Sequence, residues 1–466
     1  MNVKVVLNVL GRISLAFSIL TLSIASIAIF FNEDPTPFFT SSLISLILGI
    51  AFILKRADIH IRFKEGFAIV GLCWLLISFL GSIPFMFHLN PVDAFFESIS
   101  GFTTTGASVI KPEILPKSIL LWRALTQWIG GIGIIMIFLL IIPSIATGPV
   151  LQAEYPGITL VKIKPRIRDT ALRLFTIYVF LTILEVAILT FLGVPLFDAV
   201  THAFTTLSTG GYSTHSESIA FFNDWRIEMT AAIFAVLGGT NFTILYFLFT
   251  GKFDIIRDRE LNIYLLIILL LTLTVSIINL DRYDIVESLR YSFFQVVSIL
   301  TTTGYTTANF DDWSGGAKIL LLIAMFIGGC SGSTAGGIKI IRLYILSKYS
   351  IYQIIKSAEP KVVKTIKYGS KALRSDTIEG VLAFFVLYIF LFSISSIIIA
   401  IHGYDLITSL SATAACLGNV GPGMGLASEN YGHFPDTVKI ILCLDMWLGR
   451  LEIYTVLALF IPSFWK

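Results

Sequence analysis

The chain has 466 residues, of which 56% are hydrophobic and 14% are charged, and its formal net charge is +3. Soluble globular domains of this length do not contain so much apolar sequence, so the composition excludes the water-soluble classes of protein. Apolar runs long enough to cross a bilayer recur from one end to the other. The sequence therefore predicts an all-α polytopic membrane protein.

Basic residues cluster in alternate loops. When the loops are assigned to the two sides of a membrane in turn, most of the 33 Lys and Arg residues fall on one side, in segments such as 55–64, 162–173 and 348–374. Loops that flank membrane spans on the cytoplasmic side are normally basic. We therefore expect this side, with both termini, to be cytoplasmic, and we expect no nucleic-acid partner.

The first two apolar segments lie between residues 10 and 55 and are joined by a short turn at 32–37. The first run is longer than the apolar part of a signal peptide, and a second span follows directly, so we expect it to be retained. Residues 1–60 are thus predicted to form an accessory two-helix hairpin.

One sequence unit recurs four times after this hairpin. It consists of an apolar span, a short helix that begins with an acid, a glycine-centred segment and a second apolar span. The units are expected at residues 61–150, 151–255, 256–350 and 351–466, the last beginning with a basic linker. The central glycines, Gly106, Gly211, Gly304 and Gly421, are 105, 93 and 117 residues apart (211−106, 304−211, 421−304). This spacing predicts a fourfold pseudo-symmetric span–pore-helix–span repeat that resembles a potassium channel.

The short helices are too short to span a membrane. Their acids are Asp93, Asp198, Glu287 and Asp405, which precede the central glycines by 13, 13, 17 and 16 residues (106−93, 211−198, 304−287, 421−405). A span needs about 20 residues. An acid is favourable at a helix N-terminus, and the negative C-terminal end would then point to mid-membrane, where it favours a cation.

The glycine-centred segments are predicted to form a selectivity filter. Non-helical backbone survives at membrane depth only when it is buried in protein or lines a water-filled path, and carbonyl oxygens there can replace the water shell of a cation. Polar contacts between helices could explain one such segment, but not four at matched positions. The candidate ion-binding residues are Thr103, Thr104, Thr105, Gly106, Ser208, Thr209, Gly210, Gly211, Thr301, Thr302, Thr303, Gly304, Gly418, Asn419, Val420 and Gly421. Two adjacent glycines in the second copy leave its register open by one residue.

The second span of the third copy is expected to break. Its sequence from 328 to 339 is rich in Gly and Ser, and each Gly costs about 1 kcal/mol relative to Ala in a helix. In the fourth copy, Arg450 replaces a glycine that the other copies share, and such a cation must face water or paired groups. We predict a gate made of Gly329, Cys330, Ser331, Gly332, Ser333, Thr334, Ala335, Gly336, Gly337, Lys339 and Arg450. Asp445 and Glu452 are expected to pair with Arg450 or with nearby helices.

Other functions find less support in the sequence. The 332–339 segment is no phosphate loop, because Ile338 stands where the lysine should be and no strand precedes it. The four cysteines and six histidines have no metal or disulfide spacing, and no paired catalytic residues suggest an enzyme. A solute carrier with broken helices would have two inverted halves rather than four copies in one direction.

These motifs resemble the bacterial Trk/Ktr family of potassium uptake proteins over nearly the whole chain. The resemblance rests on the four filter segments, Gln127–Gly131, Gly328–Lys339 and Leu448–Glu452. The hairpin at 10–55 and the segment Pro165–Thr170 are closer to the TrkH branch than to the KtrB branch.

The resemblance implies potassium uptake across the inner membrane of a bacterium or archaeon. It implies that K⁺ binds only at the filter, that no cofactor is covalently attached, and that the loop and Arg450 form the gate. It also implies a homodimer and a cytosolic TrkA-like ring, which would hold any regulatory nucleotide. Glycine in all four filters, Gly106 included, is the family's potassium-favouring pattern. The alternative is a KtrB-like Na⁺-dependent or H⁺-coupled K⁺ symporter, with a solute carrier of another class behind it.

Overall fold

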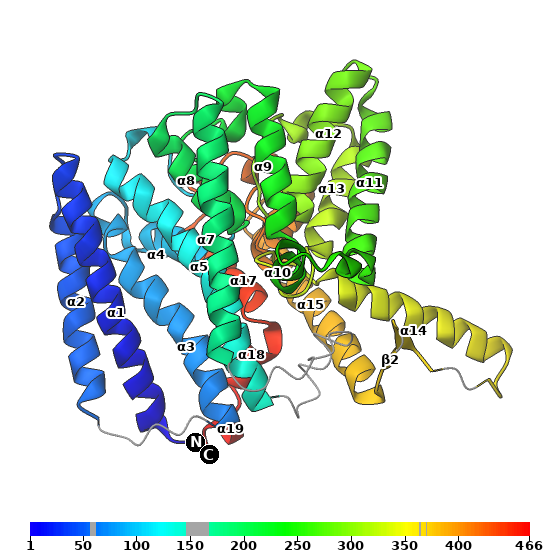
Figure 1. The fold of residues 1–466 in the computed structure, drawn as a ribbon, viewed down its shortest axis with the longest axis horizontal. Coiled ribbons are helices and arrows are strands. Elements are labelled where there is room, and N and C mark those ends of the chain that lie inside the picture. The colour runs from blue at the N-terminus through cyan, green and yellow to red at the C-terminus, as the bar shows by residue number, and fades with distance from the viewer. Residues whose placement is uncertain (56–61, 146–166, 363–364, 370) are drawn as a thin grey trace.

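The computed structural model describes residues 1–55, 62–145, 167–362, 365–369 and 371–466. The expected unit boundaries at 60/61 and 150/151 lie outside these residues, as do Pro165 and Arg166 of the family-like segment that begins there. Figure 1 shows one helical bundle with both termini at the same end. There the N-terminal amine of Met1 donates to the main-chain oxygen of Lys466 at 3.1 Å.

The helices follow the predicted order. The accessory hairpin is α1 (Val3–Phe30) and α2 (Thr36–Ile53). The first copy contains α3 (Phe63–Ser82), α4 (Pro91–Phe102) and α5 (Lys117–Ile145), and the second contains α7 (Ile167–Phe191), α8 (Leu196–Leu207), α9 (Trp225–Gly238) and α10 (Phe242–Phe249). The third contains α11 (Arg259–Asn279), α12 (Ile285–Leu300), α13 (Gly315–Ile327) and α14 (Ile340–Ala358). The fourth contains α15 (Ser375–Ile401), α16 (Leu406–Leu417), α17 (Asp436–Arg450), α18 (Ile453–Ala458) and α19 (Pro462–Trp465).

Short elements connect these helices. The 3-10 helices are η1 (Phe85–Phe87), η2 (Pro112–Ile114), η3 (Ser218–Phe222), η4 (Phe253–Arg257), η5 (Phe310–Asp312) and η6 (Gly425–Ala427). Strands β1 (Lys367–Tyr368) and β2 (Lys371–Ala372) pair antiparallel in the linker before α15. This two-residue ladder is a small addition to the predicted all-helical fold.

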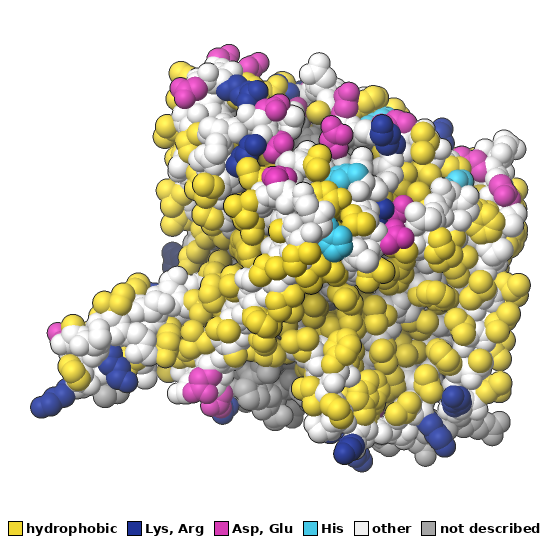
Figure 2. Space-filling view, turned by 180° about the vertical axis from the view of Figure 1, so that it is seen from behind, with side chains coloured by type: hydrophobic (Ala, Val, Ile, Leu, Met, Phe, Trp, Pro, Cys, Tyr) yellow, Lys and Arg dark blue, Asp and Glu magenta, His cyan; other side chains and the backbone are white. Residues whose placement is uncertain are grey.

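The surface is that of a membrane protein. Among the described residues, six helices are long and apolar enough to cross a membrane, or seven when α9 and α10 count as one bent span. Figure 2 shows hydrophobic side chains across the middle of one face, with charged side chains gathered towards its upper and lower edges. Such a band suits contact with lipid, because hydrocarbon excludes charge. The prediction of an all-α polytopic fold is confirmed.

The four copies pack in a closed cycle. The short helices α4, α8, α12 and α16 each lie between the two spans of their own copy. Each second span also packs on the short helix of the next copy: α5 on α8, α9 on α12, α13 on α16, and α17 on α4. The last contact closes the cycle, so the chain surrounds one axis. The accessory helix α1 packs outside this cycle, on α3 and α5.

The second spans break more often than the sequence predicted. The expected break after α13 is present, but α9 and α10 also meet at 106°, and α17 ends before α18. Asn241 caps α10 by accepting a hydrogen bond from the Thr243 amide at 2.8 Å. A side-chain cap satisfies one of the orphan N–H groups of a new helix, which stabilises the bend.

Candidate functional site: a ring of four filter segments above a loop

The four glycine-centred segments have the same backbone conformation. Each short helix ends two residues before a left-handed residue, and a glycine with positive φ follows two residues after that residue. The left-handed residues are Thr104, Thr209, Thr302 and Asn419, with φ of +50°, +54°, +59° and +54°. The glycines are Gly106, Gly211, Gly304 and Gly421, with φ of +83°, +74°, +80° and +104°. This pattern aligns Gly211 with Gly106 and so fixes the register that the sequence left open.

The same backbone hydrogen bond ties each filter segment to its helix. The amide of the third filter residue donates to the carbonyl five residues earlier in every copy. These bonds are Thr105 N to Ser100 O (2.9 Å), Gly210 N to Thr205 O (2.8 Å), Thr303 N to Ser298 O (2.8 Å) and Val420 N to Ala415 O (2.7 Å). The repeat therefore extends from the order of the elements to individual backbone bonds.

The four glycines form a ring in which each one touches the next copy. A Cβ atom added to each glycine would meet the carbonyl oxygen of the third residue of another segment. The distances are 2.0 Å from Gly106 to Gly210 O, 1.8 Å from Gly211 to Thr303 O, 2.1 Å from Gly304 to Val420 O and 2.6 Å from Gly421 to Thr105 O. Since real Cβ contacts are not this short, only glycine fits at these positions. The ring runs through the copies in order and returns to the first.

Side chains brace the filter from behind. Gln127 of α5 donates through Nε2 to Gly210 O at 2.7 Å and accepts from the Tyr212 amide at 3.1 Å. Asn419 Nδ2 donates to Thr105 Oγ1 at 2.9 Å. Gly210 O is therefore bonded to a side chain, a departure from the predicted ring of bare carbonyls, and Asn419 links the fourth segment to the first in place of the threonine of the other copies.

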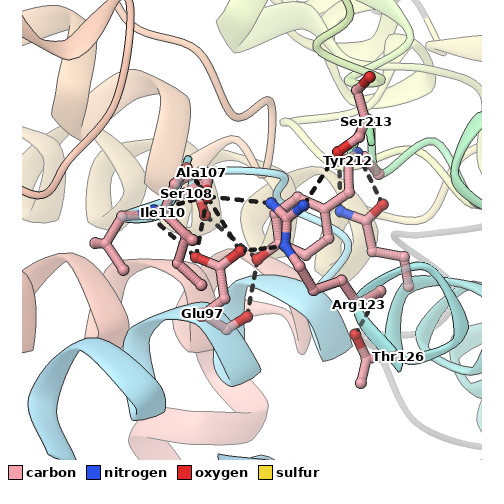
Figure 3. A network of polar contacts seen from close by, with 11 residues as sticks. Glu97, Ala107, Ser108, Ile110, Arg123, Thr126, Tyr212 and Ser213 are labelled. Carbon is pink, nitrogen blue, oxygen red and sulfur yellow. Dashed lines mark hydrogen bonds and ion pairs between the residues drawn. The ribbon is translucent and has the colours of Figure 1, made fainter. Parts of the chain in front are cut away.

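A buried ion pair within the first copy also contacts the second copy, on the side of the filter away from the loop between α13 and α14 (Figure 3). Arg123 Nε lies 2.7 Å from Glu97 Oε1, with side chains 3% and 0% exposed. The same guanidinium donates to Ser213 O and to Ser108 Oγ, each at 3.1 Å, and lies 4.1 Å from the centroid of the Tyr212 ring. Its contacts hold the residues that follow both Gly106 and Gly211.

Two tyrosines extend from the filter to the short helix of the preceding copy. Tyr212 follows Gly211 and donates to the main-chain oxygen of Glu97 at 2.8 Å. Tyr305 follows Gly304, and its hydroxyl lies 2.5 Å from Thr205 Oγ1 and donates to His202 O at 3.1 Å. These anchors were missed from the sequence, although the tyrosine after the glycine in both copies was a visible signal.

Further polar contacts join neighbouring copies on the same side of the filter. Arg290 of α12 pairs with Glu228 of α9 at 2.6 Å, and Lys439 of α17 pairs with Asp93 of α4 at 2.5 Å. Glu113 accepts from Ser216 N and Oγ at 2.6 and 2.7 Å. Burial raises the pKa of Glu113, but the hydrogen bonds from Ser216 outweigh it, so the pKa lies below its ordinary value.

The loop between α13 and α14 lies against the end of the filter that is next to the C-termini of the short helices. The Gly336 amide donates to Thr302 Oγ1 at 2.8 Å, and a Cβ on Gly336 would lie 2.3 Å from Gly418 O. Thr334 Oγ1 donates to Leu207 O at 3.1 Å and to Gly238 O at 2.9 Å. This half of the loop thus touches the second, third and fourth copies.

The other predicted loop residues lie to the side or at the ends. Cys330 N donates to Gly239 O at 2.9 Å and Phe242 N donates to Gly332 O at 3.1 Å, so this half pairs with the break between α9 and α10. Ser331 N donates to Glu260 Oε1 at 2.7 Å. The remaining contacts lie within the loop or at its ends. Ser333 Oγ donates to Cys330 O, and Lys339 Nζ donates to Ala335 O. At the two ends, Gly329 O accepts from Ile340 N, and Gly337 packs on Gly328.

Arg450 holds the loop through main-chain oxygens. Its guanidinium donates to Thr334 O at 2.6 Å and to Gly130 O at 3.2 Å, and its side chain is buried. Pairing of Asp445 or Glu452 with Arg450 is not what the structure shows. Asp445 accepts from Ser395 of α15 at 2.9 Å, and Glu452 pairs with Arg342 at 2.6 Å, so both bind neighbouring helices, as the sequence also allowed.

Comparison with known proteins agrees with this geometry. The pattern of the TrkH family, described as a cation transport protein, matches residues 36–466. Two similar proteins are the Trk system potassium uptake protein TrkH of Halomonas elongata, 35% identical with both chains fully covered, and TrkG of Escherichia coli, 35% identical over 100% of this chain and 99% of TrkG. The crystal structure of the potassium transporter TrkH from Vibrio parahaemolyticus superposes with a TM-score of 0.92 at 34% identity, with both chains fully covered. The chain belongs to the TrkH family of cation transport proteins.

Proposed function

We propose that this chain takes up potassium ions across the inner membrane of a bacterial cell, through the filter formed by its four glycine-centred segments. The observation that carries the proposal is the ring in which each filter glycine abuts a carbonyl of another segment. Main-chain oxygens around one axis can replace the water shell of a monovalent cation. Relatives with the same full-length alignment are named potassium uptake proteins.

The short helices add to the attraction for a cation. Asp93, Asp198 and Glu287 lie in the first turns of α4, α8 and α12, and Asp405 caps α16. Each helix therefore begins at an acid near the outer surface and ends at the filter, with its partial negative charge directed there. Inward movement follows the membrane potential, which contributes about 2.3 kcal/mol per charge per 100 mV.

The loop and Arg450 form the gate in this proposal, and the contacts described above are those of a closed gate. Thr334 and Gly336 lie against the inner end of the filter, and the buried guanidinium beside them repels a cation that arrives there. Opening requires the loop to leave its partners on the other copies. Main-chain bonds from Ile338 N to Phe326 O, Lys339 N to Ile327 O and Ile340 N to Gly329 O hold the two ends of the loop together. We therefore expect the predicted residues Gly329 to Gly337, with Lys339, to move as one segment.

We further propose a homodimer and a cytosolic TrkA-like ring as partners. Figure 1 shows α14 extending away from the bundle, and Ile351 and Ile354 near its far end are exposed. This apolar surface is suited to a second copy of the chain. The basic segment 348–374 follows on the cytoplasmic side and suits the regulatory ring, with both termini on that same side.

Bi-ionic currents from the purified protein in a planar bilayer test the transport proposal. Selective K⁺ current that does not respond to a pH or Na⁺ gradient is the expected result. Current that requires either gradient would instead indicate a coupled symporter, and absence of K⁺ selectivity would refute the filter.

A further inference from the structure

A second ion pair fastens the end of the loop. Arg342 lies in the first turn of α14, three residues after Lys339. Its Nη2 is 2.6 Å from Glu452 Oε2, and the two side chains are 5% and 23% exposed. The guanidinium also lies 4.1 Å from the centroid of the Phe384 ring on α15. This set of contacts binds the start of α14 to the fourth copy.

The pair acts on the same two chain segments as Arg450. Arg450 and Glu452 are separated by one residue, at the break between α17 and α18. Arg450 binds Thr334 O within the loop, whereas Glu452 binds Arg342 just beyond it. The two residues at the break between α17 and α18 therefore hold the loop at two points, one inside the loop and one just after its end.

The backbone at this contact is strained on both sides. Lys339, which precedes α14, has φ of +78°, and Glu452, which precedes α18, has φ of +64°. Residues other than glycine adopt such values only where the surrounding structure holds them. The Arg342–Glu452 pair joins the two helices that begin at these residues, so its loss would allow both turns to relax.

We propose that Arg342 and Glu452 are positioning residues that latch the gate loop in its closed conformation, in addition to Arg450. The inference rests on the proposed gate. The latch stabilises the closed state through the position of α14, and neither residue touches the ion path. A charge that loses a buried partner is costly, so removal of either member favours the state in which α14 has moved and its partner is hydrated.

The test is ⁸⁶Rb⁺ uptake by proteoliposomes of the full chain without its cytosolic partner. Glu452→Gln and Arg342→Gln are each compared with the wild type, with the charge-swapped double variant Arg342→Glu/Glu452→Arg, and with Arg450→Ala. Asp376→Asn is the matched control, since its pair with Arg374 is exposed (52% and 65%) and lies on the same side. Size-exclusion profiles and hydrogen exchange of residues 329–339 show whether each variant folds and whether the loop has been released.

The single variants are expected to raise uptake about tenfold, the effect of losing one charged hydrogen bond, and to speed exchange in the loop. The charge-swapped double variant should return both uptake and hydrogen exchange of the loop towards the wild-type values. Asp376→Asn should leave both at the wild-type values. The latch is refuted, and the gate stands, if Arg450→Ala raises uptake but the single variants do not. The same conclusion follows if the charge-swapped double variant does not lower uptake towards the wild-type value. If Arg450→Ala also leaves uptake and loop exchange unchanged, the proposed gate is refuted, and the latch with it.

Discussion

A Cβ atom on Gly304 would lie 2.1 Å from the main-chain oxygen of Val420, so the third filter segment has no room for a side chain where it meets the fourth. The same relation holds between Gly106 and Gly210, between Gly211 and Thr303, and between Gly421 and Thr105. The diameter of the ring is thus set by direct backbone contact. Any substitution at one of these glycines must push two neighbouring segments apart and so widen the ring on that side.

The first prediction concerns ion selectivity. Gly106→Ser places a Cβ 2.0 Å from Gly210 O at a residue with φ of +83°, so the two segments must separate and the ring becomes wider on one side. The ratio of rubidium to sodium uptake should fall roughly tenfold, corresponding to about 1.4 kcal/mol. Gly315→Ser, where a Cβ meets open space, is the control and should keep the wild-type ratio. An unchanged ratio in folded Gly106→Ser protein would contradict the filter assignment.

The second prediction concerns the gate. Arg450→Ala removes a charged hydrogen bond to Thr334 O, an interaction of about 1.5–3 kcal/mol, which is a factor of roughly 10 to 100 in the ratio of open to closed states. Single-channel recordings without the cytosolic partner should show a higher open probability. The open probability of Arg450→Lys should lie between those of the wild type and Arg450→Ala, because lysine keeps the charge but can reach fewer carbonyls. A folded Arg450→Ala protein that stays closed would argue against a gate here.

The third prediction concerns stability at the outer end of the filter. Glu97→Gln leaves the Arg123 charge buried without its anion, which should lower the free energy of unfolding by about 3–5 kcal/mol. Asp312→Asn, at an exposed pair with Arg282, should change it by less than about 1 kcal/mol. Thermal unfolding in detergent, followed by near-UV circular dichroism, measures both. Equal shifts for the two variants would show that the Arg123 network is not a major source of stability.

The fourth prediction concerns the tyrosine anchors. Tyr305→Phe keeps the ring but loses the hydrogen bonds to Thr205 and His202 O, a loss of about 1 kcal/mol for each typical bond. The third filter segment should then be held less firmly, so sodium permeability should rise while the fold is retained. Tyr349→Phe on α14 serves as the control. If the two variants have the same selectivity, the Tyr305 hydroxyl only satisfies buried polar groups and does not hold the filter segment.

The fifth prediction concerns external pH. Glu113 has a pKa below its ordinary value, so its carboxylate stabilises the contact with Ser216 at neutral pH, and this contribution is lost as the pH falls through the lowered pKa. Hydrogen exchange at residues 212–217 should therefore speed up only in strongly acidic buffer, below the ordinary glutamate pKa of about 4.3. Glu113→Gln should remove this dependence. An onset near neutral pH would assign the effect to another group.

The repeat could be predicted from the sequence because each copy is marked by short-range sequence features. The acid that opens each short helix, the glycine with positive φ and the glycine pair in the second span all depend on backbone chemistry that residue types reveal. Even the departures of Asn419 and Arg450 could be read as differences between copies. These features gave the fold class and the candidate filter.

The remaining details depend on contacts between distant segments. The register of Gly210 and Gly211 required backbone angles, because both residues are glycine. The break before Asn241 depends on a side-chain cap and on pairing with the loop at Gly332. The partner of Glu452 is 110 residues away in the chain, and no spacing rule could select Arg342 over Arg450.

The central claim is that four segments of one chain form a single potassium-selective path. The reversal potential of currents from the purified protein, with K⁺ on one side of a planar bilayer and Na⁺ on the other, tests it most directly. A reversal potential far towards the value for a K⁺-only membrane, reduced in Gly106→Ser, is the predicted result. A reversal potential near zero in the wild-type protein, with current that passes both ions equally, would contradict the account.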